Sequence, residues 1–75
     1  MATLSDLTPR EMQILQLILE GRTNREIAAE IFVSEKTIEF HLKNIYTKVG
    51  VRKRILVTVW AVQQGVNVES KHIQT

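Results

Sequence analysis

The chain has 75 residues, of which 44% are apolar and 24% charged, with a formal net charge of +2. This length allows one small domain, and the apolar fraction favours a folded over a disordered chain. The absence of cysteine excludes a disulfide framework, a thiolate zinc site and a cysteine nucleophile. No run of about 18 apolar residues occurs, and the first residues lack the pattern of a signal peptide. We therefore expect a cytoplasmic protein without a membrane span.

Positive charge is concentrated in the middle of the chain. Residues 1–21 carry a net charge of −2, residues 22–54 a net charge of +4, and residues 55–75 a net charge of zero. A basic segment favours a polyanionic partner such as a nucleic acid. A well-solvated helical surface has the same composition, so charge alone leaves both interpretations open.

Start and stop signals predict an all-α fold. Thr8 and Thr23 each precede a glutamate by three residues, the pattern of a capping box, and Ser34 is suited to cap a third helix. A glycine follows the first, third and fourth segments, as is common at helix C-termini. We expect a four-helix bundle with helices at about residues 8–20, 24–31, 35–49 and 52–64. Residues 1–66 are predicted to form the domain and residues 67–75 a C-terminal tail.

The link between the second and third predicted helices is only about three residues long, from Phe32 to Ser34. So short a link forces two helices to cross steeply, which is the geometry of a helix-turn-helix unit. Apolar side chains on both helices, such as Ile27 and Ile38, can share one core. The same pattern also occurs in helical bundles that do not bind DNA.

The third predicted helix has an apolar face and a polar face. At about 100° per residue, one stripe is apolar and predicted to be buried: Ile38, Leu42, Ile45 and Val49. The opposite face carries cations, hydrogen-bonding groups and one aromatic ring: Lys36, Phe40, Lys43 and Thr47, with Glu39 and Asn44 at the edges.

Side chains on this outer face suit the major groove of DNA. Lys43 can donate to guanine acceptors, Glu39 can accept from the cytosine amino group, and Phe40 can contact a thymine methyl group. Alternatively, Glu39 forms an ion pair within the helix with Lys36 or Lys43. Flanking hydroxyl, amide, imidazole and ammonium groups are candidates for DNA-backbone contacts: Thr23, Asn24, Lys36, Thr37, His41 and Lys48.

His41 lies at the border of the buried stripe. It is interpreted either as a partly buried, hydrogen-bonded imidazole or as a phosphate contact. The other histidine, His72, lies in the tail, and no second ligand stands one helical turn from His41. We therefore expect no metal site and no cofactor.

Several ordered motifs carry a resemblance to a known family. They are Leu7–Glu11, Gly21–Ala28, Val33–Ile38 and Lys48–Val51. In this order and nearly without gaps, they resemble the LuxR-type (GerE-like) helix-turn-helix domain over about residues 4–65. The resemblance implies a DNA-binding domain of a bacterial transcription regulator, with its third helix in the major groove and its fourth helix at a dimer interface. In this family such modules usually follow a receiver or sensor domain in a larger regulator, and some stand alone at about this length. RNA polymerase is a further partner that the resemblance implies.

The resemblance also assigns roles to single residues. Glu39, Phe40 and Lys43 match positions where the family reads bases, and the DNA-backbone positions match Thr23, Asn24, Thr37 and Lys48. Cations at residues 52–54 stand where a Ser or Asn cap is frequent, which predicts a loosely started fourth helix.

Two further recurrent family positions are occupied by Glu11 and Arg54. They imply an ion pair between the first and fourth helices, unless both side chains point to water.

The fourth predicted helix is apolar on two sides. Ile55, Val59 and Val62 form one stripe, and the other side gathers Val57, Trp60 and Ala61 with Gln64. Such a helix needs two partners, the core of its own domain and a second copy of the chain. We expect the dimer interface at Val57, Trp60, Ala61 and Gln64, although the helical wheel leaves open which stripe faces inward and whether Trp60 folds back onto the first helix.

The function predicted from the sequence is sequence-specific DNA binding by a dimer on an inverted-repeat operator. A Gly-rich phosphate loop and paired carboxylates in a cleft are both missing from the sequence, so no enzymatic activity is predicted. The alternative is a helical protein–protein interaction module without specific DNA binding.

Overall fold

The computed structural model describes residues 2–66, so the predicted tail lies outside the described residues. A 3-10 helix, η1 (Leu4–Asp6), precedes four α-helices: α1 (Pro9–Leu19), α2 (Asn24–Glu30), α3 (Glu35–Val49) and α4 (Arg54–Gln63). Residues 2–66 contain no strand, and the predicted all-α fold is confirmed. Helix α4 begins two residues later than predicted, at Arg54.

The predicted caps define the starts of α1, α2 and α3. Thr8 Oγ1 accepts from the N–H of Glu11 at 3.1 Å, and Glu11 Oε1 accepts from the N–H of Thr8 at 2.9 Å. Thr23 forms the same reciprocal box at the start of α2, and Ser34 Oγ accepts from Thr37 N–H at 3.1 Å. Lys53 gives α4 no side-chain cap, as expected from its sequence.

Two of the helix ends differ in the residue that takes the left-handed conformation. After α1, Gly21 has φ +85°, and the N–H of Arg22 donates to Leu17 O at 3.2 Å. After α2, Phe32 takes the equivalent place, with φ +60°, and the residue is 93% exposed. A residue with a Cβ is strained in this conformation by about 1 kcal/mol. The turn before α3 therefore carries strain that glycine would relieve.

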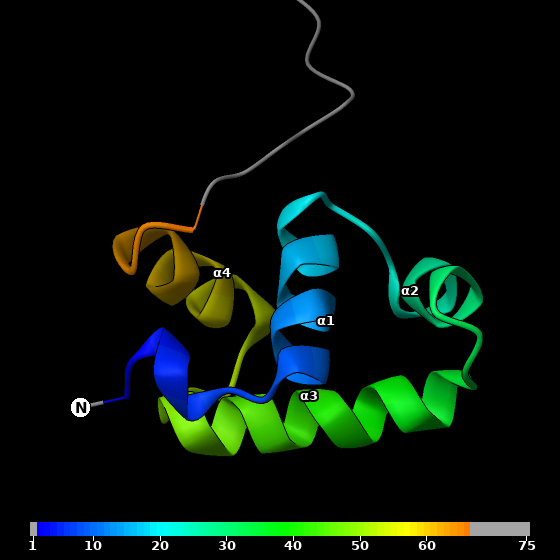
Figure 1. The fold of residues 1–75 in the computed structure, drawn as a ribbon, viewed down its shortest axis with the longest axis horizontal. Coiled ribbons are helices and arrows are strands. Elements are labelled where there is room, and N and C mark those ends of the chain that lie inside the picture. Colours follow the sequence, from blue (N-terminus) through cyan, green and yellow to red (C-terminus); the bar gives the residue numbers. More distant parts are fainter. Residues whose placement is uncertain (1, 67–75) are drawn as a thin grey trace, which may run out of the picture.

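Helix α1 stands at the centre of the fold, with α2 and α4 on opposite sides of it and α3 across its end (Figure 1). The core consists of apolar residues from all four α-helices, and the following are fully buried: Ile14, Leu15, Ile27, Ile38, Ile45, Val57 and Ala61. Figure 1 shows α1, α2 and α4 on one side of α3 and no helix against its opposite side. One face of α3 is therefore left uncovered within the described part of the chain.

Helix α4 corrects part of the predicted dimer interface. Val57 and Ala61 are fully buried in the core, so they cannot form an interface with a second copy, and their assignment was wrong. They lie one turn apart and are small, which lets α4 approach α1 closely. Trp60 is partly buried and packs against the same core, whereas Gln64 is exposed.

Four exposed apolar side chains lie on the outward side of α4: Ile55, Leu56, Val59 and Val62.

Candidate nucleic-acid interface

The uncovered face of α3 carries the predicted base-reading residues. Glu39, Phe40 and Lys43 are exposed, as are Lys36 and Thr47, and the exposed fraction of Phe40 is 62%. Glu39 forms no ion pair with any of the described residues, so the predicted intrahelical pair is absent. The face therefore presents an unpaired carboxylate, two lysines and an aromatic ring together.

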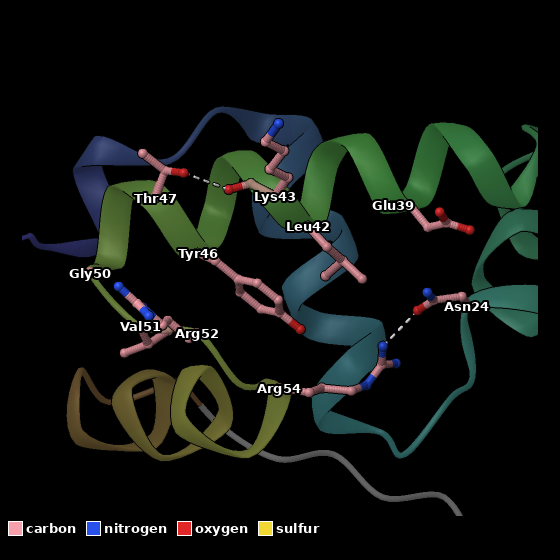
Figure 2. Close-up of a pocket in the computed structure, with 10 residues that line it drawn as sticks. All are labelled: Asn24, Glu39, Leu42, Lys43, Tyr46, Thr47, Gly50, Val51, Arg52 and Arg54. Carbon is pink, nitrogen blue, oxygen red and sulfur yellow. Dashed lines mark hydrogen bonds between the residues drawn. The ribbon is translucent and has the colours of Figure 1, made fainter.

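A groove runs along one flank of α3, between this helix and α4; we call it the α4-side groove. Figure 2 shows its lining: Asn24, Glu39, Leu42, Lys43, Tyr46, Thr47, Gly50, Val51, Arg52 and Arg54. Three of these side chains are cationic and one is a carboxylate, which gives the groove a positive formal balance. Such a balance attracts an anion.

Arg54 spans this groove from the first turn of α4. Its Nη1 donates to Asn24 Oδ1 at 2.6 Å, and its Nη2 donates to the carbonyl oxygen of Arg22 at 2.5 Å. The predicted Glu11–Arg54 ion pair is therefore wrong. Arg54 instead joins the start of α4 to the loop and first residue of α2, through two uncharged oxygen atoms.

A second groove lies on the other flank of α3, beside the N-terminus of α1; we call it the α1-side groove. It is lined by Thr8, Glu11, Phe40, His41, Asn44, Thr47 and Lys48. The rings of Phe40 and His41 meet edge to face, with centroids 5.8 Å apart. His41 is partly buried, but its imidazole has no hydrogen-bond partner among residues 2–66, so the hydrogen-bonded interpretation is not supported.

Glu11 is the partner of Lys48 in this second groove. Lys48 Nζ lies 2.6 Å from Glu11 Oε1, and the side chains are 35% and 4% exposed, respectively. Burial alone would raise the pKa of Glu11, but the hydrogen bonds and charge of Lys48 and the N–H and hydroxyl of Thr8 outweigh it. The pKa of Glu11 therefore lies below its ordinary value.

The remaining predicted contacts lie at the starts of α2 and α3. The side chain of Thr23 caps α2, and Thr37 Oγ1 lies 3.0 Å from Ser34 Oγ at the start of α3. The prediction omitted Arg52, Asn44 and Thr47, which line the two grooves. Their signal was in the sequence, because Asn44 and Thr47 share the polar face of α3 and Arg52 opens a run of three cations.

Neither a metal-ligand cluster nor a membrane span is found among the described residues. Within residues 2–66, no three His, Cys, Asp or Glu side chains gather as metal ligands would. None of the helices described is both long and apolar enough to cross a membrane.

Comparison with known proteins identifies the family. The sequence profile of the bacterial regulatory proteins of the LuxR family matches residues 5–61. The chain is 39% identical over 59 residues to the spore germination protein GerE of Bacillus subtilis, covering 79% of this chain and 80% of GerE. It is 41% identical over 62 residues to a nitrate/nitrite response regulator protein homolog of Haemophilus influenzae, covering 83% of this chain but only 30% of that protein.

A solved structure agrees with these relatives. The response regulator ChrA of a heme-sensing two-component system matches with a TM-score of 0.75 and 45% identity, over 77% of this chain and 29% of that chain. The four helices, the uncovered face of α3 and the matched profile lead to one conclusion: the chain belongs to the LuxR family of bacterial transcription regulators and carries its helix-turn-helix DNA-binding domain.

Proposed function

We propose that the chain binds double-stranded DNA sequence-specifically, with α3 as the recognition helix in the major groove. The observation that carries this proposal is the uncovered polar face of α3, which lies between two grooves lined by polar and cationic side chains. The major groove is roughly 12 Å wide and admits one helix. Family membership supports this function and gives no support to an enzymatic one.

The two grooves fit the two DNA strands that border a major groove. With α3 inserted, Asn24 and Arg52 of the α4-side groove face one phosphate backbone, and His41 and Lys48 of the α1-side groove face the other. Phosphate contacts of this kind fix the position of a protein on DNA but do not select sequence. Thr23, Lys36 and Thr37, at the starts of α2 and α3, complete the proposed backbone contacts.

Base selection is assigned to Lys43, Glu39 and Phe40. Replacing any of them by alanine should relax the preference at one base pair. The binding free energy that favours the preferred base there should fall by roughly 1–3 kcal/mol. The preferred sequence is first obtained by selection from a pool of random duplexes, and each variant is then titrated against single-base changes. Arg52→Ala is the control, because it should weaken binding to all sequences alike. Unchanged preferences in the Lys43, Glu39 and Phe40 variants would refute the assignment.

We also propose that the chain pairs on DNA through the outward stripe of α4. The exposed fractions of Ile55, Val59 and Val62 are 63%, 45% and 50%. A symmetric dimer would bury the same patch on each copy. Pairing would set two recognition helices about 34–36 Å apart, one turn of DNA. So small a patch gives weak association, so pairing is expected on DNA rather than free in solution.

The dimer is tested by Val59→Glu. This variant should lose cooperative binding to a duplex with two half-sites and keep its affinity for one half-site. The glutamates of the two copies would repel each other across the symmetry axis. Gln64→Glu adds the same charge at the end of the same helix, about 140° around the helix from Val59, and serves as the control. Retained cooperativity in Val59→Glu would exclude this interface.

The chain spans about 30% of the length of the Haemophilus influenzae relative, whereas it spans 80% of GerE. We propose that it acts in the cytoplasm, where bacterial DNA lies, as the output part of a regulator. A receiver or sensor domain that controls it, and RNA polymerase as the partner it recruits, are part of this proposal. No cofactor and no catalytic step are included.

A further inference from the structure

The hydrogen bond between Arg54 and Asn24 fixes the orientation of the asparagine amide. A guanidinium group has only donors, whereas a carboxamide has an oxygen acceptor on one side and an NH₂ donor on the other. The 2.6 Å contact from Arg54 Nη1 is therefore made to Oδ1 (Figure 2), and both N–H bonds of Nδ2 point elsewhere. Within residues 2–66 the side chain of Asn24 has no other partner, so this donor is available to a ligand.

Asn24 lies where such a donor is useful. It is the first residue of α2, is partly exposed, and lines the α4-side groove together with Lys43 and Arg52. A phosphate oxygen placed in this groove would meet the amide N–H groups and two cations. The amide would therefore fix the direction of the phosphate contact, and the two cations would supply the positive charge.

Arg54 also fixes the backbone beside Asn24. Its second bond, to the carbonyl oxygen of Arg22 at 2.5 Å, holds the loop that leads into α2. Because both acceptors are uncharged, the positive charge of Arg54 is not cancelled by either of them. The planar fork of one guanidinium group makes both bonds at once, which a lysine ammonium cannot reproduce with the same geometry.

We propose that Arg54 is a positioning residue for DNA binding: it turns the amide donor of Asn24 toward a DNA phosphate and holds the start of α2 against the start of α4. This inference rests on the proposed function. It links α4, the helix assigned to pairing, to a phosphate contact made by α2.

Asn24→Asp separates the two roles of Asn24. The carboxylate keeps an oxygen for Arg54 and makes an ion pair with it, but it replaces the amide donor by a negatively charged oxygen. The folded state should be at least as stable as that of the unchanged chain in a thermal melt. Affinity for duplex DNA should fall roughly tenfold or more, since a hydrogen bond to a charged group is lost and a like charge faces the phosphate. Unchanged affinity would overturn the proposal.

A double-substitution cycle tests whether Arg54 acts through Asn24. Arg54→Lys keeps the charge and should lower duplex affinity about as much as Asn24→Ala, and the double variant should lose little beyond either single one. If Arg54→Lys weakens binding equally with and without Asn24, Arg54 acts independently and the proposal is wrong. A purely structural role would shift the melting temperature without this coupling in affinity.

The failure of this inference is distinguishable from that of the proposed function. If the unchanged chain shows no salt-dependent binding to duplex DNA, the proposed function fails. If it binds and the two substitutions add independently, only the role of Arg54 fails. Should Arg54→Lys not fold, the cycle is repeated with Arg54→Gln in its place, and equal losses of affinity with and without Asn24 would again overturn the proposal.

Discussion

Lys48 and Arg54 are cations on opposite flanks of α3, but their partners differ. Lys48 pairs with the buried carboxylate of Glu11 at 2.6 Å, so most of its charge is balanced inside the protein. Arg54 donates to two uncharged oxygens, and neither Lys43 nor Arg52 beside it has an ion-pair partner among residues 2–66. This difference predicts that Lys48 contributes mainly to stability, and that the cations of the α4-side groove contribute more than Lys48 to the proposed phosphate binding.

The largest effect on stability is expected from Glu11→Ala. This substitution removes the cap on Thr8 N–H, the partner of Lys48 and a buried side chain, and it should lower the free energy of unfolding by about 2–3 kcal/mol. Lys48→Ala leaves the cap intact and should cost about 1–2 kcal/mol, because it leaves a buried carboxylate without its cation. Urea unfolding measures both. A loss below about 0.5 kcal/mol for Glu11→Ala would contradict the stabilising role of this flank.

Acid should reduce the stability that Glu11 contributes. The pKa of Glu11 is lowered from 4.5 in the folded state, so its ionised form contributes stability above pH 4.5, and this contribution is lost as the pH falls through the folded pKa. Glu11→Gln has no such titration. The difference in unfolding free energy between the unchanged chain and Glu11→Gln should therefore narrow on acidification below pH 4.5. A constant difference across that window would show that the carboxylate charge is unimportant.

A smaller effect is expected at Phe32, which belongs to neither groove next to α3. Phe32→Gly should change the free energy of unfolding by at most about 1 kcal/mol, in the stabilising direction, because relief of the left-handed backbone outweighs the added freedom of the unfolded chain. Phe32 is 93% exposed, so the substitution loses little packing. Thermal unfolding tests this. Gly21→Ala, the opposite exchange after α1, is the matched control and should be destabilising; stabilisation by it would contradict the strain argument.

Local features of this fold were predictable from the sequence. The caps at Thr8, Thr23 and Ser34 depend on residues three positions apart, and α3 shows its buried stripe directly in its spacing. For the same reason, the outward positions of Glu39, Phe40 and Lys43 on α3 were predicted correctly. Whether these three side chains read bases stays a prediction.

Contacts between distant segments were not predictable in the same way. The resemblance to the family implied a pair between Glu11 and Arg54, and only the packing of α3 across the end of α1 brings Lys48 rather than Arg54 to Glu11. The two apolar stripes of α4 have similar hydrophobicity, so periodicity could not assign the inner one. The small side chains of Val57 and Ala61 decide it, because they allow close packing against the core.

The most direct test of DNA binding is a titration of the 75-residue chain with a duplex at several salt concentrations. The logarithm of the association constant should fall linearly with the logarithm of the salt concentration, because phosphate contacts release counterions. Arg52→Ala should flatten this slope by about one, and Lys48→Ala by less, since Glu11 already balances its charge. Binding that is absent at low salt or independent of salt would contradict the account and favour a protein-interaction module built on the outward stripe of α4.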